Sequence, residues 1–469
     1  MNMTNRRTLD APAGQQSRVT VVGTGYLGAT HAVCMAALGH DVLGVDVDES
    51  KIEALAAGSV PFFEPGLPEL LQETLESGRL RFTTSFDEAA AFGDVHFVCV
   101  GTPQASDSDA ADLRYVESAF SELASRIDRR SLLVGKSTVP VGTAARLEQV
   151  VQDQSPAGDD LALAWNPEFL REGFAVEDTL HPDRLVFGVS SEWAEETLRS
   201  VFHPLIGAGT PVVVADLATA ELTKVAANSF LATKISYINA MSEVCEAAGA
   251  DVNVLAEALS FDDRIGGRFL KPGLGFGGGC LPKDIRAFRH RARELGAGQA
   301  VAFLGEVDAI NLRRRARTVD LVRELAGDDL RDTTVAALGA AFKPNSDDVR
   351  DAPALDVARM LYLEGARVRV YDPEAISNAH RVYPDLDYAE SLHDVLVGAD
   401  VVVLLTEWDE FCDADPVELA KLVATPRMVD ARHALDAEDY RAAGWDFCEL
   451  GVGQDTHVTV EAFDRLGRG

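Results

Sequence analysis

A glycine-rich turn between two short apolar runs is the feature that most restricts the fold of this chain. The β-branched run Arg18–Val22 leads directly into Gly23-Thr-Gly25-Tyr-Leu-Gly28, and a later run at 41–46 ends in Asp46. A strand, this turn, a helix and a second strand ending in an acidic residue predict a dinucleotide-binding Rossmann unit. The glycines permit a tight turn and close approach of a pyrophosphate to the helix N-terminus. The Asp46 carboxylate favours NAD over NADP, because it accepts from a ribose hydroxyl and repels a 2′-phosphate.

The same order of parts occurs twice along the chain. Buried-strand patterns at 94–100 and 131–136 extend the first set, and runs at 334–339, 367–372 and 400–405 form a second set. Strands that alternate with helices predict parallel sheets covered on both faces. The second set lacks G-x-G-x-x-G and need not bind a dinucleotide.

A long helical pattern separates the two sets. Residues 216–248 contain no Pro or Gly and repeat apolar side chains at helical spacing. The glycine-rich segment 272–279 follows, and a second helical stretch runs from 283 to 326 with a possible break at 296–298. The apolar stripe from 222 to 245 is long enough to pair with a copy of itself, so we expect a homodimer through this central helix.

The predicted fold class is therefore α/β, with two Rossmann-like doubly wound domains joined by a long central helix and a helical dimerisation region. The expected organisation is a disordered tail at 1–17, an NAD-binding Rossmann domain at 18–215, a central helical region with a cysteine loop at 216–328, and a C-terminal Rossmann-like domain at 329–469.

Composition excludes several classes of function. Lys and Arg number 43 against 75 Asp and Glu, a net charge of −32 that argues against broad nucleic-acid or acidic-membrane surfaces. The chain has no membrane-length apolar run and no apolar segment in its first 17 residues, so we expect a cytoplasmic protein. Six scattered cysteines without C-x-x-C spacing predict neither a metal site nor a disulfide framework.

Lysine is scarce: 8 lysines stand beside 35 arginines. Low Lys with a strongly acidic balance favours a halophilic protein, since concentrated salt screens a large net charge. A GC-biased genome is the alternative explanation. Six of the eight lysines fall in the segments that carry the candidate functional residues discussed next: 136, 224, 234, 271, 283 and 343.

Four polar clusters follow predicted strands or helices: Lys136–Gly142, Asn166–Gly173, Glu221–Asn228 and Gly275–Asp284. Lys224 and Asn228 are four residues apart, so they share one face of the long helix, where a buried lysine needs a carboxylate or an anionic ligand. Cys280 precedes a helix start and a nearby lysine, a setting that favours the thiolate. Taken singly, an inert buried cysteine and a surface lysine remain alternatives.

Together these clusters resemble the UDP-glucose/GDP-mannose 6-dehydrogenase family, from about residue 18 to about 455. The resemblance implies two successive NAD-linked oxidations that convert a nucleotide sugar's C6 alcohol to a carboxylic acid, with the uronic acid used in polysaccharide biosynthesis. It also implies that the C-terminal domain binds the nucleotide sugar. The residues fit this reaction, since a thiolate can hold an aldehyde intermediate as a thiohemiacetal between the two oxidations.

The resemblance also implies catalytic roles. Cys280, in GFGGGC, resembles the nucleophile that later carries a thioester, and Glu168, in NPEFLREG, resembles the base that activates water for hydrolysis. Lys224 and Asn228 are similar to the pair that stabilises negative charge on the C6 oxygen.

Further roles follow in the same way. Asp284 and Thr138 resemble residues that order a water for proton transfer. The implied NAD contacts are Gly23, Gly25, Tyr26, Leu27, Gly28, Asp46, Lys51, Thr102, Thr138, Glu172 and Arg350. The implied substrate contacts are Glu168, Phe169, Leu170, Lys224, Asn228, Arg264, Phe269, Leu270, Lys271, Gly277 and Lys343, with Arg264 reaching across a dimer interface.

Two positions depart from the family pattern, and several alternatives stay open. Gly279 stands where many members have Ser, and Asn166 begins a motif that others begin with Ser or Ala. The motifs also suit GDP-mannose dehydrogenases. An N-acetylhexosamine-nucleotide dehydrogenase fits the cysteine loop less well. A two-electron β-hydroxyacid-type dehydrogenase needs neither Cys280 nor a second Rossmann half, and a non-catalytic NAD-binding protein needs none of the catalytic set.

Overall fold

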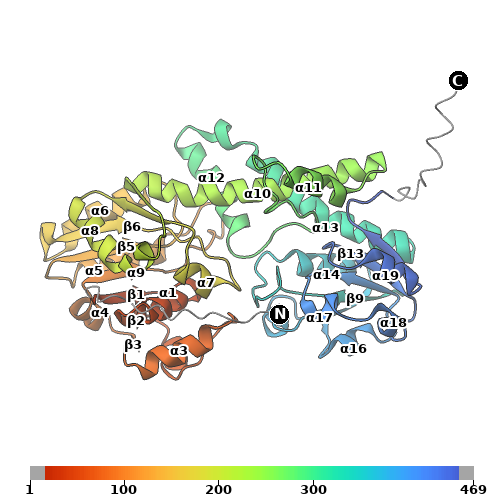
Figure 1. The fold of residues 1–469 in the computed structure, drawn as a ribbon, viewed down its shortest axis with the longest axis horizontal. Helices are drawn as coiled ribbons and strands as arrows, with labels where there is room; N and C mark the ends of the chain where they lie inside the picture. The colour runs from red at the N-terminus through yellow and green to blue at the C-terminus, as the bar shows by residue number, and fades with distance from the viewer. Residues whose placement is uncertain (1–15, 454–469) are drawn as a thin grey trace. The chain divides into compact units, whose positions relative to one another are not determined.

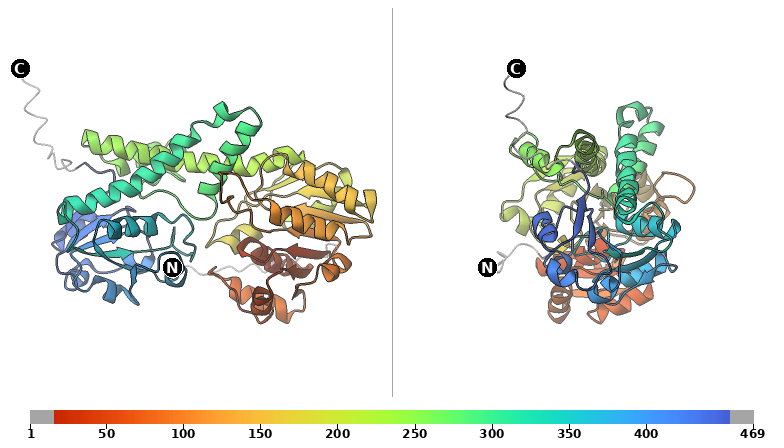
Figure 2. Two further views of the ribbon diagram at one scale, coloured as in Figure 1. Left: turned by 180° about the vertical axis from the view of Figure 1, so that it is seen from behind. Right: turned by 90° about the vertical axis from the view of Figure 1, so that its right-hand side faces the viewer.

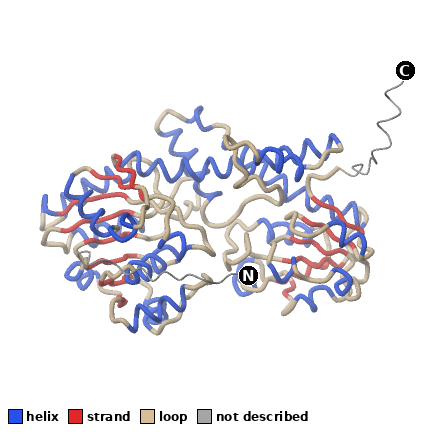
Figure 3. The backbone as a smooth tube through the Cα atoms, in the orientation of Figure 1, coloured by secondary structure: helices blue, strands red, loops and turns tan. Residues whose placement is uncertain are grey.

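The computed structural model describes residues 16–453. Most of the predicted tail at 1–17 and the last residues of the predicted C-terminal domain lie outside the described residues. The chain divides into two compact units, Met1–Ala227 and Asn228–Gly469. Each unit holds one sheet with helices packed on it (Figure 1), and Figure 3 shows the strands of each sheet in red between helices in blue.

The first unit contains an eight-stranded sheet in the order β3-β2-β1-β4-β5-β6-β7-β8. Neighbouring strands are parallel except β6 and β7, which pair antiparallel. The first six strands thus follow the order of a dinucleotide-binding sheet. The strands are β1 (Arg18–Val22), β2 (Asp41–Val45), β3 (Leu80–Thr83), β4 (Val95–Val98), β5 (Ser131–Gly135), β6 (Leu161–Trp165), β7 (Leu185–Val189) and β8 (Val212–Ala215).

Both faces of this sheet are buried, because successive side chains of a strand point to opposite sides. Val21, Phe97 and Val134 belong to one apolar cluster, whereas Val98 and Leu133 belong to another. The covering helices are α1 (Tyr26–Ala37), α2 (Glu49–Ala56), α3 (Leu67–Glu76), α4 (Phe86–Phe92), α5 (Arg114–Ala124), α6 (Thr143–Gln154), α7 (Ala175–Leu180), α8 (Glu192–Val201) and α9 (His203–Gly207), with a 3-10 turn η1 (Gly158–Asp160).

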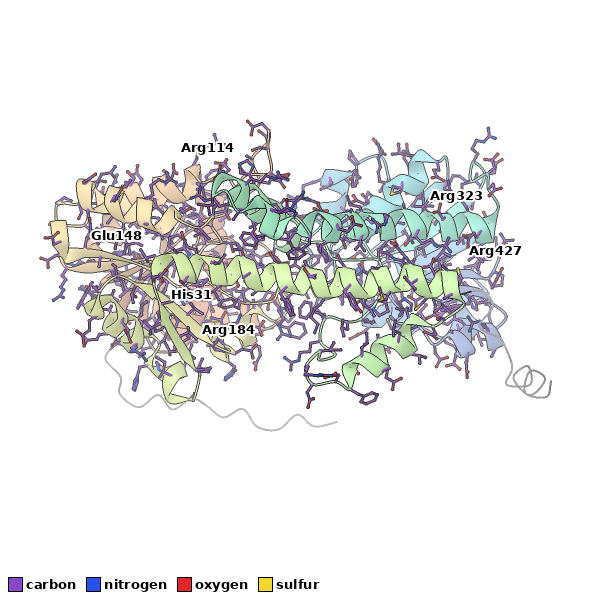
Figure 4. The ribbon with its side chains drawn as sticks, turned by 90° about the horizontal axis from the view of Figure 1, so that it is seen from above. His31, Arg114, Glu148, Arg184, Arg323 and Arg427 are labelled. Atoms are coloured by element: carbon purple, nitrogen blue, oxygen red, sulfur yellow. The ribbon has the colours of Figure 1, made fainter. Side chains whose placement is uncertain are left out.

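The predicted central helix is confirmed as α10 (Leu217–Ala248), a single element of 32 residues (Figure 4). The boundary between the two units falls within it, after Ala227. The absence of Pro and Gly lets its backbone hydrogen bonds continue without a break.

The second unit continues with α11 (Val252–Ser260), α12 (Leu281–Glu294), η2 (Gly298–Val301) and α13 (Leu304–Ala326). The predicted break at 296–298 is confirmed, since α12 ends at Glu294 and Gly296 adopts a φ of 75° that favours glycine. The glycine-rich segment 272–279 forms the loop that leads into α12.

A six-stranded parallel sheet completes the second unit, in the order β11-β10-β9-β12-β13-β14. Relative to its own strand numbering, this order repeats that of β1 to β6 in the first unit. The strands are β9 (Thr334–Leu338), β10 (Arg367–Tyr371), β11 (Asp387–Tyr388), β12 (Val401–Leu404), β13 (Arg427–Asp430) and β14 (Asp446–Glu449). The helices are α14 (Pro353–Leu363), α15 (Ile376–Val382), α16 (Leu392–Leu396), α17 (Asp409–Cys412), α18 (Pro416–Leu419) and α19 (Ala437–Ala442), visible from two sides in Figure 2.

The α/β class and the two Rossmann-like halves are therefore confirmed. The sequence patterns did not reveal the antiparallel pairing of β6 with β7, nor the strands beyond them at the sheet edge. Between residues 16 and 453 no helix combines the length and the hydropathy that crossing a membrane requires.

Candidate active site

The loop between β1 and α1 forms a cradle that only glycine permits. Gly23 has a φ of 89°, and a Cβ there would lie 2.8 Å from Val100 Cγ1. A Cβ on Gly28 would lie 1.7 Å from the Gly23 carbonyl oxygen, so α1 packs closely on the loop. Gly25, the N-cap of α1, has no heavy atom within 4 Å of its Cβ position. The open space at the helix N-terminus fits the pyrophosphate of a dinucleotide.

The Asp46 carboxylate at the end of β2 is buried and fixes this loop. Oδ2 accepts from the Thr24 backbone N–H at 2.8 Å, and Oδ1 accepts from the Asp48 N–H at 3.0 Å. Lys51 Nζ lies 3.8 Å from Asp46 Oδ2. The acidic residue predicted to contact the ribose is thus held in place by the glycine loop itself.

Glu64, which the sequence patterns did not single out, lies beneath the first turn of α1. Its buried carboxylate accepts from the Tyr26 hydroxyl, from the Gly173 N–H at 2.6 Å and from the Ala175 N–H at 2.7 Å. Burial and the Glu64 carboxylate both raise the pKa of Tyr26, which keeps the phenol protonated. Glu64 therefore ties a predicted NAD contact to the end of the segment that carries Glu168.

The loops after β4 and β5 meet at Thr102 and Thr138, two of the predicted NAD contacts. The Thr102 hydroxyl donates to the Thr138 carbonyl oxygen at 2.9 Å. Thr102 is buried and Thr138 is half-buried. Since these loops lie at the carboxyl ends of neighbouring strands, they occupy the edge of the sheet where such folds bind ligands.

The buried ammonium of Lys224 finds its carboxylate partner in Glu168. Lys224 Nζ lies 2.8 Å from Glu168 Oε1, and Glu168 Oε2 accepts from the Leu170 N–H at 2.7 Å. Phe169 lies between two cations, with Arg184 Cζ 3.8 Å and Lys224 Nζ 5.6 Å from its ring centroid (Arg184 is labelled in Figure 4). The structure thus brings together three residues with predicted substrate roles.

A second lysine of the first unit is also buried. Lys136 Nζ donates to Asn166 Oδ1 at 2.9 Å, and Asn166 Nδ2 donates to the Val186 carbonyl oxygen at 3.0 Å. Burial lowers the pKa of Lys136 to about 8. The sequence placed Lys136 in a cluster but gave it no role.

In the second unit, Cys280 is the N-cap of α12 and is exposed. The preceding loop is fixed by Asn311, which is buried on α13. Its Oδ1 accepts from the Phe276 N–H and its Nδ2 donates to the Phe276 carbonyl, both at 2.8 Å. A Cβ on Gly275 would lie 2.2 Å from Asn311 Oδ1, so this clamp requires glycine.

Asn228 and Asp284 form a buried pair, and Asp284 lies one helical turn after Cys280 in the chain. Asn228 Nδ2 donates to Asp284 Oδ2 at 2.7 Å, and Lys283 Nζ lies 2.5 Å from Asp284 Oδ1. The Asp284 N–H donates to the Cys280 carbonyl at 3.0 Å, which is the first turn of α12. The amide of Asn228 and the thiol of Cys280 are therefore linked through one helical turn and one carboxylate.

The structure explains why glycine fits at position 279. A Cβ at this position would lie 2.2 Å from Arg350 Cζ, so the guanidinium occupies the space that a serine side chain would need. Asp348 holds that arrangement, because it pairs with Arg350 at 2.6 Å and accepts from the Gly279 N–H at 3.3 Å. A serine at 279 requires Arg350 to move.

Arg432 is a second feature that the sequence patterns missed. Its guanidinium donates to the carbonyls of Leu405 at 2.6 Å, Gly275 at 3.2 Å and Phe342 at 3.3 Å. It therefore connects the glycine-rich loop to the ends of β9 and β12 in the C-terminal sheet.

The other positions with predicted contacts are Leu27 and Glu172 in the first unit, and Arg264, Phe269, Leu270, Lys271, Gly277 and Lys343 in the second. Arg264 is exposed and pairs with Asp262 at 2.5 Å. Phe269 adopts a φ of 65°, which is rare for an aromatic residue. Lys343 Nζ lies 5.3 Å from the Phe342 ring centroid. Their contacts with a sugar nucleotide stay predictions.

Cys280 differs from the other five cysteines, all of which lie within the described residues. Only Cys280 is exposed. Burial raises the pKa of Cys99 and of Cys448 to about 12, and that of Cys412 to about 11. These thiols stay protonated near neutral pH, which leaves Cys280 as the candidate nucleophile. A separate question is whether the chain could bind a metal ion. Within residues 16–453 no group of His, Cys, Asp and Glu side chains could hold one.

Comparison with known proteins shows that three segments of the chain match the three domains of one protein family. Residues 17–206 match the NAD binding domain of the UDP-glucose/GDP-mannose dehydrogenase family, residues 218–313 match its central domain, and residues 336–437 match its UDP binding domain. The glycine cradle and Asp46 lie in the first of these segments, and NAD is the cofactor.

Similar proteins cover nearly the whole chain. The UDP-glucose 6-dehydrogenase of Rhizobium meliloti is 41% identical over 436 residues, 92% of this chain and 99% of that protein. UDP-glucose 6-dehydrogenase YwqF of Bacillus subtilis is 38% identical, with 92% and 97% covered. A UDP-glucose dehydrogenase structure from the archaeon Pyrobaculum islandicum is 38% identical, has a TM-score of 0.86 and covers 96% of this chain and 100% of its own.

The difference in thiol burial gives a first testable prediction. Brief treatment of the native protein with iodoacetamide at pH 7.5 should label about one thiol per chain, at Cys280, because the other thiols are buried or held protonated. Peptide mass spectrometry locates the label. Cys280→Ser is the control and should take up almost none, whereas rapid labelling of a second cysteine in the native protein would contradict the assignment.

Proposed function

Because the chain belongs to the UDP-glucose/GDP-mannose dehydrogenase family, we propose that it oxidises the C6 alcohol of UDP-glucose to the carboxylate of UDP-glucuronate, with two NAD reduced for each sugar nucleotide. The observation that carries the four-electron reaction is the single exposed thiol, Cys280, at the start of α12 beside the Asn228–Asp284 pair. The relatives named above support UDP-glucose as the substrate.

The first oxidation converts the alcohol to an aldehyde. NAD, held on the loop of Gly23, Gly25 and Gly28, supplies the hydride acceptor for both oxidations. The hydroxyl proton leaves to a water ordered by Asp284 and Thr138. Lys224 and Asn228 stabilise the negative charge that develops on the C6 oxygen, which lowers the barrier to hydride loss.

The second oxidation uses the thiol. The Cys280 thiolate adds to the aldehyde carbon, and the carbonyl oxygen takes up a proton to give a thiohemiacetal. Loss of that proton and of a hydride leaves a thioester. Glu168 then removes a proton from water as the water attacks the thioester carbon, and the C–S bond breaks to release the acid and the thiolate. The 2.8 Å contact with Lys224 supports this role, because it holds the Glu168 carboxylate beside a second residue with a predicted role at the substrate.

The alternative functions differ from this one in their substrate or in the residues that they require. A GDP-mannose dehydrogenase uses the same mechanism on another nucleotide sugar, and the match of residues 336–437 to a UDP binding domain favours the uridine nucleotide. A two-electron dehydrogenase of the β-hydroxyacid type needs no exposed thiol in the site. The reaction stoichiometry separates the two-electron class from the four-electron dehydrogenases, and the choice of sugar nucleotide separates the two four-electron candidates.

We therefore expect two NADH for each UDP-glucose consumed, because both oxidations occur before the product leaves. The measurement is NADH absorbance with limiting UDP-glucose, GDP-mannose or UDP-N-acetylglucosamine in parallel. Cys280→Ser is the matched variant and should lose at least about 100-fold in rate of acid formation, because it lacks the thiolate. A yield of one NADH, or full acid formation by Cys280→Ser, would remove the thioester from the mechanism.

We further propose that α10 pairs with its copy in a homodimer. Phe230, Tyr237 and Val244 are 65%, 50% and 57% exposed and recur every seven residues, so they share one face of the helix. A row of large apolar side chains that faces water is typical of a surface that another chain covers.

Light scattering should find a dimer for the native chain. Phe230→Glu together with Tyr237→Glu should dissociate it, because both charges would be buried in the interface. Exchange of the exposed Val417, which lies on α18, for Glu is the control and should leave the dimer intact. A monomeric native protein would contradict the proposal.

A further inference from the structure

Lys136 is a buried cation for which the proposed mechanism has no use. It follows β5 and has 7% of its surface exposed, and its Nζ lies 5.9 Å from the ring centroids of both Phe97 and Phe202. Its ammonium donates a 2.9 Å hydrogen bond to Asn166 Oδ1. An ammonium in such surroundings is costly unless the site gains from its charge.

The groups that face Lys136 come from four elements. They are His31 on α1, Cys99 after β4, Glu168 after β6 and Lys224 on α10. Burial lowers the pKa of His31 well below its usual value, and burial raises the pKa of Cys99 to about 12, so both are neutral near pH 7 (His31 is labelled in Figure 4). The charged groups are two ammoniums and one carboxylate.

This cluster therefore carries a surplus positive charge within a chain of net charge −32. Burial is the main reason that the pKa of Lys136 falls to about 8; the Glu168 carboxylate opposes the fall and the Lys224 ammonium adds to it. Lys136 thus carries its proton at neutral pH and loses it a few pH units below an exposed lysine.

We propose that Lys136 is a positioning residue for Glu168, orienting the start of segment 166–173 through Asn166 and stabilising the Glu168 carboxylate beside Lys224. The Asn166 amide is held at both ends, by Lys136 and by the Val186 carbonyl, and Glu168 follows two residues later. Lys224 Nζ holds the Glu168 carboxylate itself at 2.8 Å, and Lys136 holds the residue at which the segment starts. The role of Glu168 in this inference rests on the proposed function.

The first test needs no substrate. Thermal unfolding of Lys136→Met, Glu168→Gln and the double variant forms a cycle that reports their interaction. We expect the changes in midpoint to be non-additive at pH 7 and the non-additivity to shrink as pH rises through about 8, where Lys136 loses its proton. Additive changes at pH 7 would overturn the inference, whatever reaction the protein catalyses.

The pH dependence of the same unfolding measurements also tests the pKa of Lys136. The folded-state pKa of Lys136, about 8, lies below its ordinary value of 10.5, so the unfolded chain binds more protons between these pH values. The native protein should therefore gain stability relative to Lys136→Met as pH rises from 8 to 10.5. A constant difference across that range would contradict a buried, charged Lys136.

The second test follows the chemistry. A quenched single-turnover assay measures acid release as a function of pH. Lys136→Met should move the acid limb of this rate upward by roughly half to one pH unit, because one of the two cations of the cluster is removed and only Lys224 remains. Lys136→Arg keeps the charge and should leave the limb in place even where the rate falls. Superimposable limbs for the native protein and Lys136→Met would overturn the inference.

Controls separate charge from packing. Lys136→Gln keeps a donor for Asn166 without the charge, so it should shift the limb as Met does; it also replaces Lys136→Met in both tests if that variant fails to fold. Lys421→Met removes an exposed lysine paired with Glu418 and should change neither readout. Two NADH per UDP-glucose with an unshifted limb would remove the role of Lys136 and leave the proposed function standing.

Discussion

The contact between Lys224 and Glu168 is the interaction on which the proposed chemistry depends. Removing the Glu168 carboxylate would break the ion pair of the buried Lys224 ammonium, a loss that costs several kcal/mol in typical proteins. The fold supports this contact from two sides, because α10 presents the lysine and the segment after β6 presents the carboxylate. The pair therefore marks a position where the chain keeps charge in its interior for function.

Both units contain a Rossmann-like sheet, but the two sheets differ in the loop that follows their first strand. In both sheets, a buried aspartate follows the second strand in chain order: Asp46 after β2 and Asp372 after β10. Asp372 accepts from the N–H groups of Ala340 and Ala341 and from the Trp408 indole, so protein donors occupy it. No G-x-G-x-x-G precedes Asp372. The repeated fold thus explains the shared aspartate, and only the first copy has the cradle for a pyrophosphate.

The sequence patterns predicted the features that depend on residues close to one another in the chain. The glycine turn, seven of the strands (β1, β2, β4, β5, β9, β10 and β12) and the uninterrupted α10 could be predicted, because their signals lie within a few residues of one another. Glu64, the Lys136–Asn166 bond and the Arg350 guanidinium over Gly279 could not, because each joins residues far apart in the chain. The antiparallel β6–β7 pair escaped for the same reason.

The central claim is that one thiol carries the sugar between two oxidations. The most direct measurement is the intact mass of Glu168→Gln after incubation with UDP-glucose and NAD, since this variant lacks the base for hydrolysis. The account predicts a thioester adduct whose added mass is that of UDP-glucuronate less one water, located at Cys280 by peptide mapping and absent from Glu168→Gln/Cys280→Ser. Release of two NADH without any covalent adduct in Glu168→Gln would contradict it.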